Sequence, residues 1–405
     1  MRNFEGGGPE AGIAGIAGIA GIAGIAGIAG IAGIAGIAGI AGIGQQNPLT
    51  SDALITNRDG ISGTPLPTPF PVAAPSPENA KNLSRLSADV RASIFDFELA
   101  SRIGFAASPR TSNDPAVARV FQMETTANAG DAPTCAYQPL ITMSEPTMDT
   151  FQTQLSYLFS YADLRPDRGA EILAQIGSPV AFMASIGFMD AGRTPHTLEL
   201  LATVLRLARF VEMRVKYSLA CKRPLEFSPQ VQPMIPTPTH GTLPSGHATE
   251  AFILARTVWK LMRASNAPQY NANDGVFGDM LMRQAARVAI NRTVAGVHFP
   301  VDSVSGALLG LTLADFVSER CTYCTGDTGQ RTSASFNGEN FAGADDFNWH
   351  QLYTAPDDAQ VADQIGTDGK WMTSQTEDTA TDLTDSAPLQ WLWGKAVKEW
   401  TDITS

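Results

Sequence analysis

A long amphipathic pattern that begins at Thr194-Pro195 most constrains the fold of this chain. Threonine followed by proline is typical of a helix start, because the fixed φ of proline suits the first turn. Apolar side chains then recur at helical spacing until a stop near Pro224, at Leu198, Leu201, Leu205, Ala208, Val211 and Val215. Similar patterns cover approximately residues 83–103, 145–161, 167–176, 178–190, 245–264, 273–291 and 301–320. No run of alternating strands stands out, so we expect an all-α fold, a helical bundle with long Pro-rich loops.

The remaining segments differ in composition from this helical region. Residues 1–47 form a low-complexity arm with eleven tandem Ala-Gly-Ile copies at 11–43. That run is long enough to span a bilayer, but glycine at every third position argues against a stable helix, so an arm is favoured over a membrane anchor. We expect 48–82 to be an extended Pro-rich segment, 83–325 to be the helical domain, and 326–405 to be a polar extension with a short helix near 386–401, packing on the domain or on a partner.

Charge and cysteine content exclude some function classes. The 405-residue chain has a formal net charge of −12, with 44% hydrophobic and 17% charged residues. A nucleic-acid partner is therefore not expected, and any anion site must be a local concentration of Lys and Arg. Cys321 and Cys324 form a C-x-x-C, but no second pair completes a zinc site. A local disulfide or free thiols are favoured over a redox pair, and the compartment stays open: secreted, periplasmic or cytoplasmic.

Three segments carry the residues for anion chemistry: Lys216-x6-Arg223-Pro224, Pro244-Ser245-Gly246-His247, and Asn291-Arg292-x5-His298-x3-Asp302. A tetrahedral oxyanion has several charged oxygens, which Lys216, Arg223 and Arg292 would neutralise. Ser245 and Gly246 lie where a helix begins, and unpaired N–H groups at a helix start favour an anion. Each segment alone is ordinary, but the three together point to a binding site for phosphate or vanadate.

The histidines of these segments predict the chemical roles. His298 would bond the central atom of the anion, and His247 would exchange protons on the opposite side. Asp302, one helical turn after His298, would fix the tautomer of that imidazole.

The three segments resemble the superfamily shared by vanadium haloperoxidases and type-2 phosphatidic-acid-phosphatase-like acid phosphatases, which reads K-x6-R-P, P-S-G-H and S-R-x5-H-x3-D. The departure is Asn291, where the family has Ser. The resemblance implies a haloperoxidase-like helical fold and an oxyanion held by Lys216, Arg223, Ser245, Gly246 and Arg292. It makes His298 the axial ligand of vanadate, or the nucleophile of a phosphatase. His247 would contact the apical oxygen.

His240, five residues before Ser245, resembles the histidine that bromoperoxidases of this family place beside the active site. The expected function is therefore a vanadate-dependent haloperoxidase that oxidises bromide or iodide with hydrogen peroxide and halogenates small organic acceptors, with vanadium as a Lewis acid. Residues 83–405 contain no obvious apolar run of about 20 residues, so we expect a soluble homo-oligomer. The alternatives are a soluble acid phosphatase that uses His298, and a helical assembly protein with a degenerate phosphate site.

Overall fold

The computed structural model describes residues 48–61, 74–126, 134–271, 275–324, 329–366, 368–379 and 386–403. The Ala-Gly-Ile run at 11–43 lies outside the described residues, so the low-complexity arm stays a prediction. The chain divides into two compact units, residues 1–82 and 83–405.

The described part of the first unit contains a helix that sequence reasoning missed. Helix α4 (Pro48–Ile61) occupies the start of the segment expected to be extended. The prolines that suggested an extended chain begin only at Pro65, while Pro48 itself is compatible with the first turn of a helix. The expectation of an extended segment is therefore wrong for residues 48–61.

The helices of the second unit follow the predicted pattern closely. They are α5 (Ala88–Ala100), α6 (Met148–Ala162), α7 (Arg165–Ala174), α8 (Val180–Gly187), α9 (Pro195–Leu219), α10 (Pro224–Phe227), α11 (Gly246–Ala264), α12 (Pro268–Asn271), α13 (Val276–Val294), α14 (Pro300–Thr322) and α15 (Ala387–Asp402). Short 3-10 turns lie at η3 (Ala80–Arg85), η4 (Pro229–Val231), η5 (Gly338–Asn340) and η6 (Trp349–Gln351). The helices expected from 145 to 320 are all present, and so is the short helix expected near 386–401.

The expectation of an all-α fold is wrong, because a mixed sheet covers one side of the helices. Its strands are β1 (Ile103–Ser108), β2 (Val117–Thr126), β3 (Thr134–Ser144), β4 (Gly329–Phe336), β7 (Asp363–Gly366) and β8 (Gly369–Thr379), in the order β1-β2-β3-β4-β8-β7. Strands β3 and β4 pair in parallel, and the other neighbours pair antiparallel. A second, two-stranded sheet joins β5 (Tyr353–Thr354) to β6 (Ala359–Gln360). The chain is therefore α/β.

The burial of β2 explains why its pattern was missed. Its residues alternate between buried and partly buried positions, as a strand requires. However, the buried positions include Gln122 and Glu124, which bond to Arg320 and Arg331, while apolar Phe121 and Met123 lie on the other face. Polar residues face the helices here and apolar residues face outward, so hydrophobicity does not alternate along the sequence.

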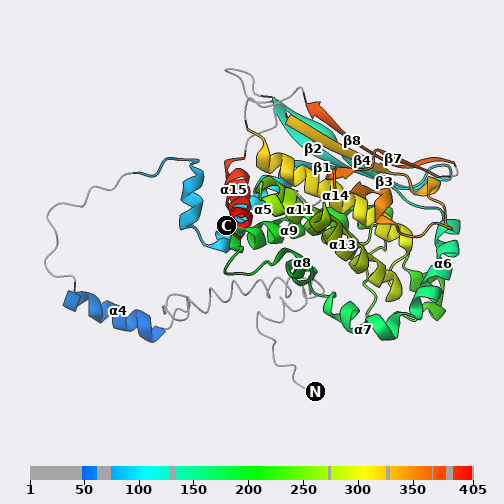
Figure 1. The fold of residues 1–405 in the computed structure, drawn as a ribbon, viewed down its shortest axis with the longest axis horizontal. Helices are drawn as coiled ribbons and strands as arrows, with labels where there is room; N and C mark the ends of the chain where they lie inside the picture. The colour runs from blue at the N-terminus through cyan, green and yellow to red at the C-terminus, as the bar shows by residue number, and fades with distance from the viewer. Residues whose placement is uncertain are drawn as a thin grey trace, which may run out of the picture. The chain divides into compact units, whose positions relative to one another are not determined.

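Close packing between α11 and α14 forms the centre of the second unit. A Cβ at Gly306 would lie 2.5 Å from the Ser245 carbonyl oxygen, and one at Gly310 would lie 2.4 Å from the Thr249 carbonyl oxygen. Only glycine permits this approach, which brings the start of α11 against α14. Figure 1 shows α14 between the sheet on one side and α11, α13 and α9 on the other. The same packing brings together the helix ends that carry the motif residues.

Helix α14 also has the length and composition of a membrane span, and its apolar window is fully buried inside the chain. The expectation that residues 83–405 lack such a stretch is therefore wrong. Contacts with α11 and the sheet surround α14. Burial of this kind is typical of core helices, so the finding is weak evidence for a membrane span.

The C-terminal helix α15 stabilises the start of α9. Glu399 accepts hydrogen bonds from the backbone N–H groups of His196 and Thr197, at 2.7 and 2.8 Å. These are first-turn donors of α9 that have no acceptor within their own helix.

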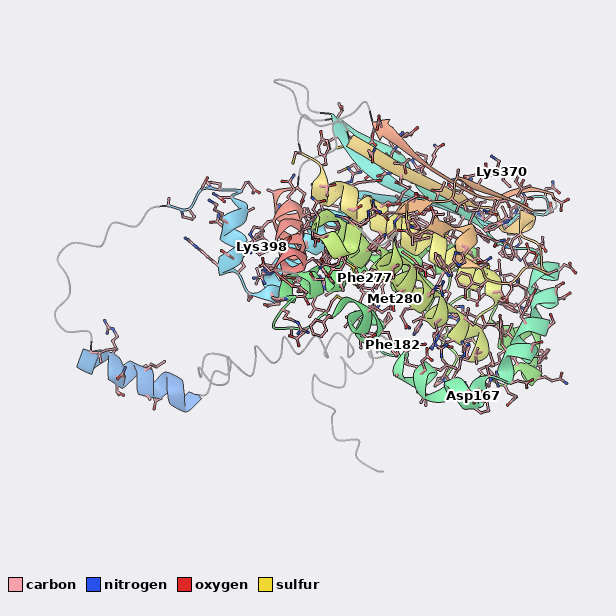
Figure 2. The ribbon with its side chains drawn as sticks, in the orientation of Figure 1. Asp167, Phe182, Phe277, Met280, Lys370 and Lys398 are labelled. Atoms are coloured by element: carbon pink, nitrogen blue, oxygen red, sulfur yellow. The ribbon has the colours of Figure 1, made fainter. Side chains whose placement is uncertain are left out.

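Figure 2 shows Lys398 of α15 and Lys370 of β8 on different sides of this unit, and Asp167 of α7 on the side away from the sheet.

Candidate active site

The three motif segments meet at the ends of five helices. Lys216 lies in the last turn of α9, and Arg223 directly precedes α10. Ser245 is the N-cap of α11, and Arg292 lies in the last turn of α13. His298 lies two residues before α14, whose first turn contains Asp302. We call the set Lys216, Arg223, Ser245, Gly246, His247, Arg292 and His298 the anion site.

His298 is held in one tautomer. Its Nδ1 lies 3.0 Å from Oδ2 of Asp302, which also accepts from the Phe299 backbone N–H at 2.9 Å and from the Thr242 hydroxyl. Because a carboxylate only accepts, Nδ1 carries the proton. On the other edge of the ring, Nε2 lies 3.1 Å from Arg223 Nη1, which only donates. Nε2 is therefore the unprotonated nitrogen, and its lone pair accepts this hydrogen bond until an electrophilic atom replaces the guanidinium donor.

Arg223 connects the two loops of the site. Its Nη1 donates to the Val297 carbonyl at 2.9 Å, and its Nε donates to the His240 carbonyl at 3.0 Å. Its Nη2 lies 3.0 Å from His240 Nδ1, which also lies 3.1 Å from the Gly241 carbonyl oxygen. The structure therefore brings His240 next to the anion site through Arg223.

Arg292 and His247 meet at the C-terminal end of α7. Arg292 Nη2 donates to the Ile172 carbonyl at 3.2 Å and to Gln175 Oε1 at 3.1 Å. His247 Nε2 donates to the Gln175 carbonyl at 3.1 Å, which leaves its Nδ1 as the free nitrogen. Arg292 is 1% exposed, and its Nε and Nη1 have no hydrogen-bond partner among the described residues. These two donors are available to a ligand beside the start of α11, which distinguishes Arg292 from other buried cations of the chain.

Lys216 lies at the site, but its ammonium group contacts protein carbonyls. Nζ donates to the carbonyl oxygens of Thr242 at 3.2 Å, Gly241 at 3.4 Å and Pro244. The lysine thus holds the loop before α11 and places its charge near the start of that helix. An arriving anion would compete with these carbonyls for the ammonium hydrogens.

The start of α11 adds backbone donors to this set. The side chain of Ser245 accepts from the Ala248 N–H at 3.4 Å, as an N-cap does, and its hydroxyl hydrogen stays available. The first N–H groups of α11 have no acceptor within the helix, and the helix dipole gives this end partial positive charge. Both effects favour an anion at this position.

Burial, and then the positive charge of the site, disfavour protonated histidines. Burial, and then the charge of Arg292, lower the pKa of His247 to about 3. Burial and the charge of Lys216 lower the pKa of His240 to about 4, and burial with Arg223 lowers the pKa of His298 well below its usual value. Burial also lowers the pKa of Arg292 to about 10. The site therefore has excess positive potential, which a bound dianion would relieve.

Sequence reasoning missed several positioning residues. Gln175 contacts both Arg292 and His247, and Thr242 donates to Asp302. Asn291, the departure from the family pattern, donates from Nδ2 to Gln175 Oε1 at 2.9 Å and to Glu171 Oε1 at 3.0 Å. Asparagine here ties α13 to α7. Gln175 lies 41 residues before the first motif residue, so no motif spacing could have indicated it.

A polar cavity of about 860 Å³ lies apart from this site, between α11, α14, β4 and β8. In its lining, Arg256 bonds Asp315 at 2.8 Å and Lys260 bonds Asp358 at 3.2 Å. Glu319 accepts from the Thr332 hydroxyl, and its Oε2 has no partner among the described residues. No residue of the anion site lines it.

The four cysteines are free thiols, which agrees with one of the two outcomes expected for Cys321 and Cys324. Among the described residues, no cluster of three or more His, Cys, Asp or Glu side chains could hold a metal ion. The donors gathered here, cations and one imidazole lone pair, fit an oxyanion rather than a bare cation.

Comparison with known proteins follows this geometry. The sequence profile of the PAP2 superfamily matches residues 197–323, the stretch from α9 to α14. Residues 197–323 are a PAP2 superfamily domain. This PAP2 domain contains every residue of the anion site. The crystal structure of a transmembrane PAP2-type phosphatidylglycerolphosphate phosphatase from Bacillus subtilis aligns at a TM-score of 0.35 and 20% identity, over 42% of this chain and 86% of that one. A search of curated protein sequences finds no significant match.

Proposed function

We propose that the PAP2 domain hydrolyses phosphate monoesters through a phosphohistidine at His298. The arrangement of His298 carries the proposal, because Asp302 fixes the proton on Nδ1 and leaves the Nε2 lone pair directed at the anion site. Arg223 lies 3.1 Å from that nitrogen and would hold a phosphoryl oxygen next to it. Ester hydrolysis at this site needs neither a change of oxidation state nor a halide ion.

In the first step, Nε2 of His298 attacks phosphorus. An N–P bond forms as the bond between phosphorus and the ester oxygen breaks, and the electron pair of that bond leaves with the alcohol. Asp302 stabilises the positive charge that develops on the ring. Arg223, Arg292 and the start of α11 stabilise the charge on the equatorial oxygens. His247 supplies the proton to the leaving oxygen.

In the second step, water attacks the phosphohistidine from the side where the alcohol left. His247, now neutral, accepts a proton from this water, the N–P bond breaks, and its electrons return to Nε2. Phosphate leaves, and the site returns to its starting state. Each residue thus reverses its role between the two steps, as microscopic reversibility requires.

Substrate binding makes His247 a suitable acid. Burial and the charge of Arg292 lower its pKa to about 3 without an anion. A phosphoryl dianion would offset those positive charges and raise this pKa, so the proton is taken up with the substrate. Acid activity would therefore depend on the bound ester and would be absent from the empty site.

The test is a phosphomonoesterase assay together with trapping of the intermediate. We expect turnover of a chromogenic phosphate ester and an acid-labile, alkali-stable phosphoprotein on rapid quenching. The His298→Ala variant should lose both. The matched control is His196→Ala, since His196 contacts Glu399 at the far end of α9. Turnover without a phosphoprotein, or full activity of His298→Ala, would refute the assignment of His298.

A second candidate is the vanadate-dependent haloperoxidase, which the position of His240 favours. Its ring bonds Arg223 at 3.0 Å and is half-buried beside the site. Vanadate would be held by His298, Arg223, Arg292, Lys216 and the start of α11, and it would supply Lewis-acid activation of hydrogen peroxide for bromide or iodide oxidation. A peroxide and bromide assay of the vanadate-loaded protein, run beside the ester assay, separates the two functions. Light scattering of the same samples tests the expected homo-oligomer.

A further inference from the structure

Glu212 is a buried carboxyl group that neither mechanism uses. It lies on α9, one helical turn before Lys216, and is 2% exposed. Its Oε2 has no hydrogen-bond partner among the described residues, and no ion pair joins it to a cation of the described chain. An unpaired buried carboxylate costs several kcal/mol, roughly, so such a group either finds a cation or keeps its proton.

The carboxyl lies directly against the start of α11. A Cβ at Gly246 would be 2.7 Å from Glu212 Oε1 and 3.3 Å from Oε2. The absence of a side chain at Gly246 thus makes room for this carboxyl group. Glu212 therefore reaches the helix start that the anion site uses, from the side of α9.

The groups around Glu212 do not neutralise it. Burial has the largest effect and Glu250 the next, and together they raise the pKa of Glu212 to about 8 against the charges of Lys216, Arg209 and Arg223. Arg209 Nε bonds Glu250 Oε1 at 2.7 Å, and Lys216 Nζ bonds backbone carbonyls. Arg209 and Lys216 thus bond other groups, although Nη1 of Arg209 has no partner among the described residues. Arg223 donates to the carbonyls of His240 and Val297.

We propose that Glu212 is a positioning residue of the anion site that works as a neutral carboxylic acid, and that oxyanion binding requires this carboxyl to keep its proton. While neutral, Glu212 fills the space beneath Gly246 and does not offset the positive potential of Lys216 or of the start of α11. Once ionised, it competes with the anion for that potential and repels it. The inference rests on the proposed anion chemistry, but it concerns binding alone.

The test compares phosphate binding by the wild type and by Glu212→Gln, which keeps the size of the side chain but cannot ionise. Calorimetric titration with inorganic phosphate at pH 6.5 and pH 9 gives a ratio of dissociation constants, wild type over variant, at each pH. The ionisation of phosphate affects both proteins and cancels in this ratio. The charge of Glu212 raises the pKa of Lys216, so Lys216 loses its charge at lower pH in the variant, and this works against the expected rise of the ratio at pH 9. The ratio should be near one at pH 6.5 and about tenfold higher at pH 9, one unit above the pKa of Glu212.

Glu199→Gln provides the matched control, because Glu199 is also a buried carboxyl group on α9 but pairs with Arg91 at 2.8 Å. Its ratio should not change with pH. If Glu212→Gln does not fold, Glu212→Met, neutral and of similar length, should show the same rise. A ratio that stays constant between pH 6.5 and pH 9 would overturn the proposal, because a purely structural role does not depend on ionisation. A ratio already far above one at pH 6.5 would also overturn it, because the carboxyl would then be ionised at neutral pH. Failure of the wild type to bind phosphate at any pH would instead reject the proposed function.

Discussion

Replacing Arg292 by methionine should abolish anion binding and leave the anion-free protein about as stable as the wild type. Arg292 is 1% exposed, with two unpaired donors, Nε and Nη1. An unsatisfied buried donor on a charged group costs about 1–3 kcal/mol, so the two donors cost about 2–6 kcal/mol when no anion is bound. The hydrogen bonds of Nη2 to Ile172 and Gln175 contribute about 3–6 kcal/mol in the opposite direction. Methionine removes both effects and fills the space, so the free energy of unfolding should change by less than about 2 kcal/mol.

Phosphate should separate the two proteins. At a phosphate concentration of 100 times Kd, binding adds about 2.7 kcal/mol to the stability of the wild type. For a unit of this size that amounts to a rise in Tm of about 5 °C. Arg292→Met should show no such rise. Thermal unfolding followed by circular dichroism, with and without phosphate at constant ionic strength, measures both quantities.

Arg320→Met is the matched control for this experiment. Arg320 is also 1% exposed and also has Nε and Nη1 unpaired, but it lies at the end of α14, bonded to Gln122 beneath the sheet. Its methionine variant should keep the full phosphate-dependent rise in Tm. An undiminished rise in Arg292→Met, or an anion-free variant destabilised by much more than 3 kcal/mol, would refute the reasoning from unpaired donors.

Three further predictions concern the neighbours of Arg292. Asp302→Asn should lower kcat for phosphate esters by about 10²–10⁴-fold with little change in KM, because the preferred tautomer of His298 is lost; a steady-state assay measures this. Gly246→Ala should weaken phosphate binding, measured by calorimetry, because the new Cβ meets Glu212, and adding Glu212→Ala should restore part of it. The pKa of His247 is about 3 in the folded chain and about 6.5 unfolded, so the unfolded state binds the proton more readily and stability should fall as pH drops from about 6.5 toward 3. In urea unfolding, saturating phosphate should make this fall shallower.

The helical part of the fold could be predicted because its signals are local. Pro195 and Pro300 begin helices, and apolar residues recur at helical spacing behind them. The sheet could not be predicted, because its inner face contains buried polar residues such as Gln122 and Glu124 whose partners come from α14 and β4. The partners of these buried polar side chains lie about 200 residues later in the sequence. Such a strand shows no alternating pattern of hydrophobicity.

The anion site shows the same division. Its cations and histidines lie at fixed spacings in the sequence, because each motif lies at the end of a helix and these helix ends meet in space. Gln175, Thr242 and Glu212 have no such spacing, since each acts through one or two contacts with a motif residue. Their roles become visible only when burial and hydrogen-bond partners are known, and unpaired atoms are the most informative of these observations.

A chain with a net charge of −12 can bind a dianion only if its carboxylates are kept from neutralising the site. Each carboxyl group near the site has another role. Asp302 accepts from His298, Thr242 and a backbone N–H, and Glu226 accepts from the Arg223 backbone N–H at 2.7 Å. Glu250 bonds Arg209, and burial beside Glu250 raises the pKa of Glu212 to about 8, which favours its neutral form at pH 7. These carboxylates therefore leave Nε and Nη1 of Arg292 unpaired, so the charge of Arg292 stays available for the proposed anion.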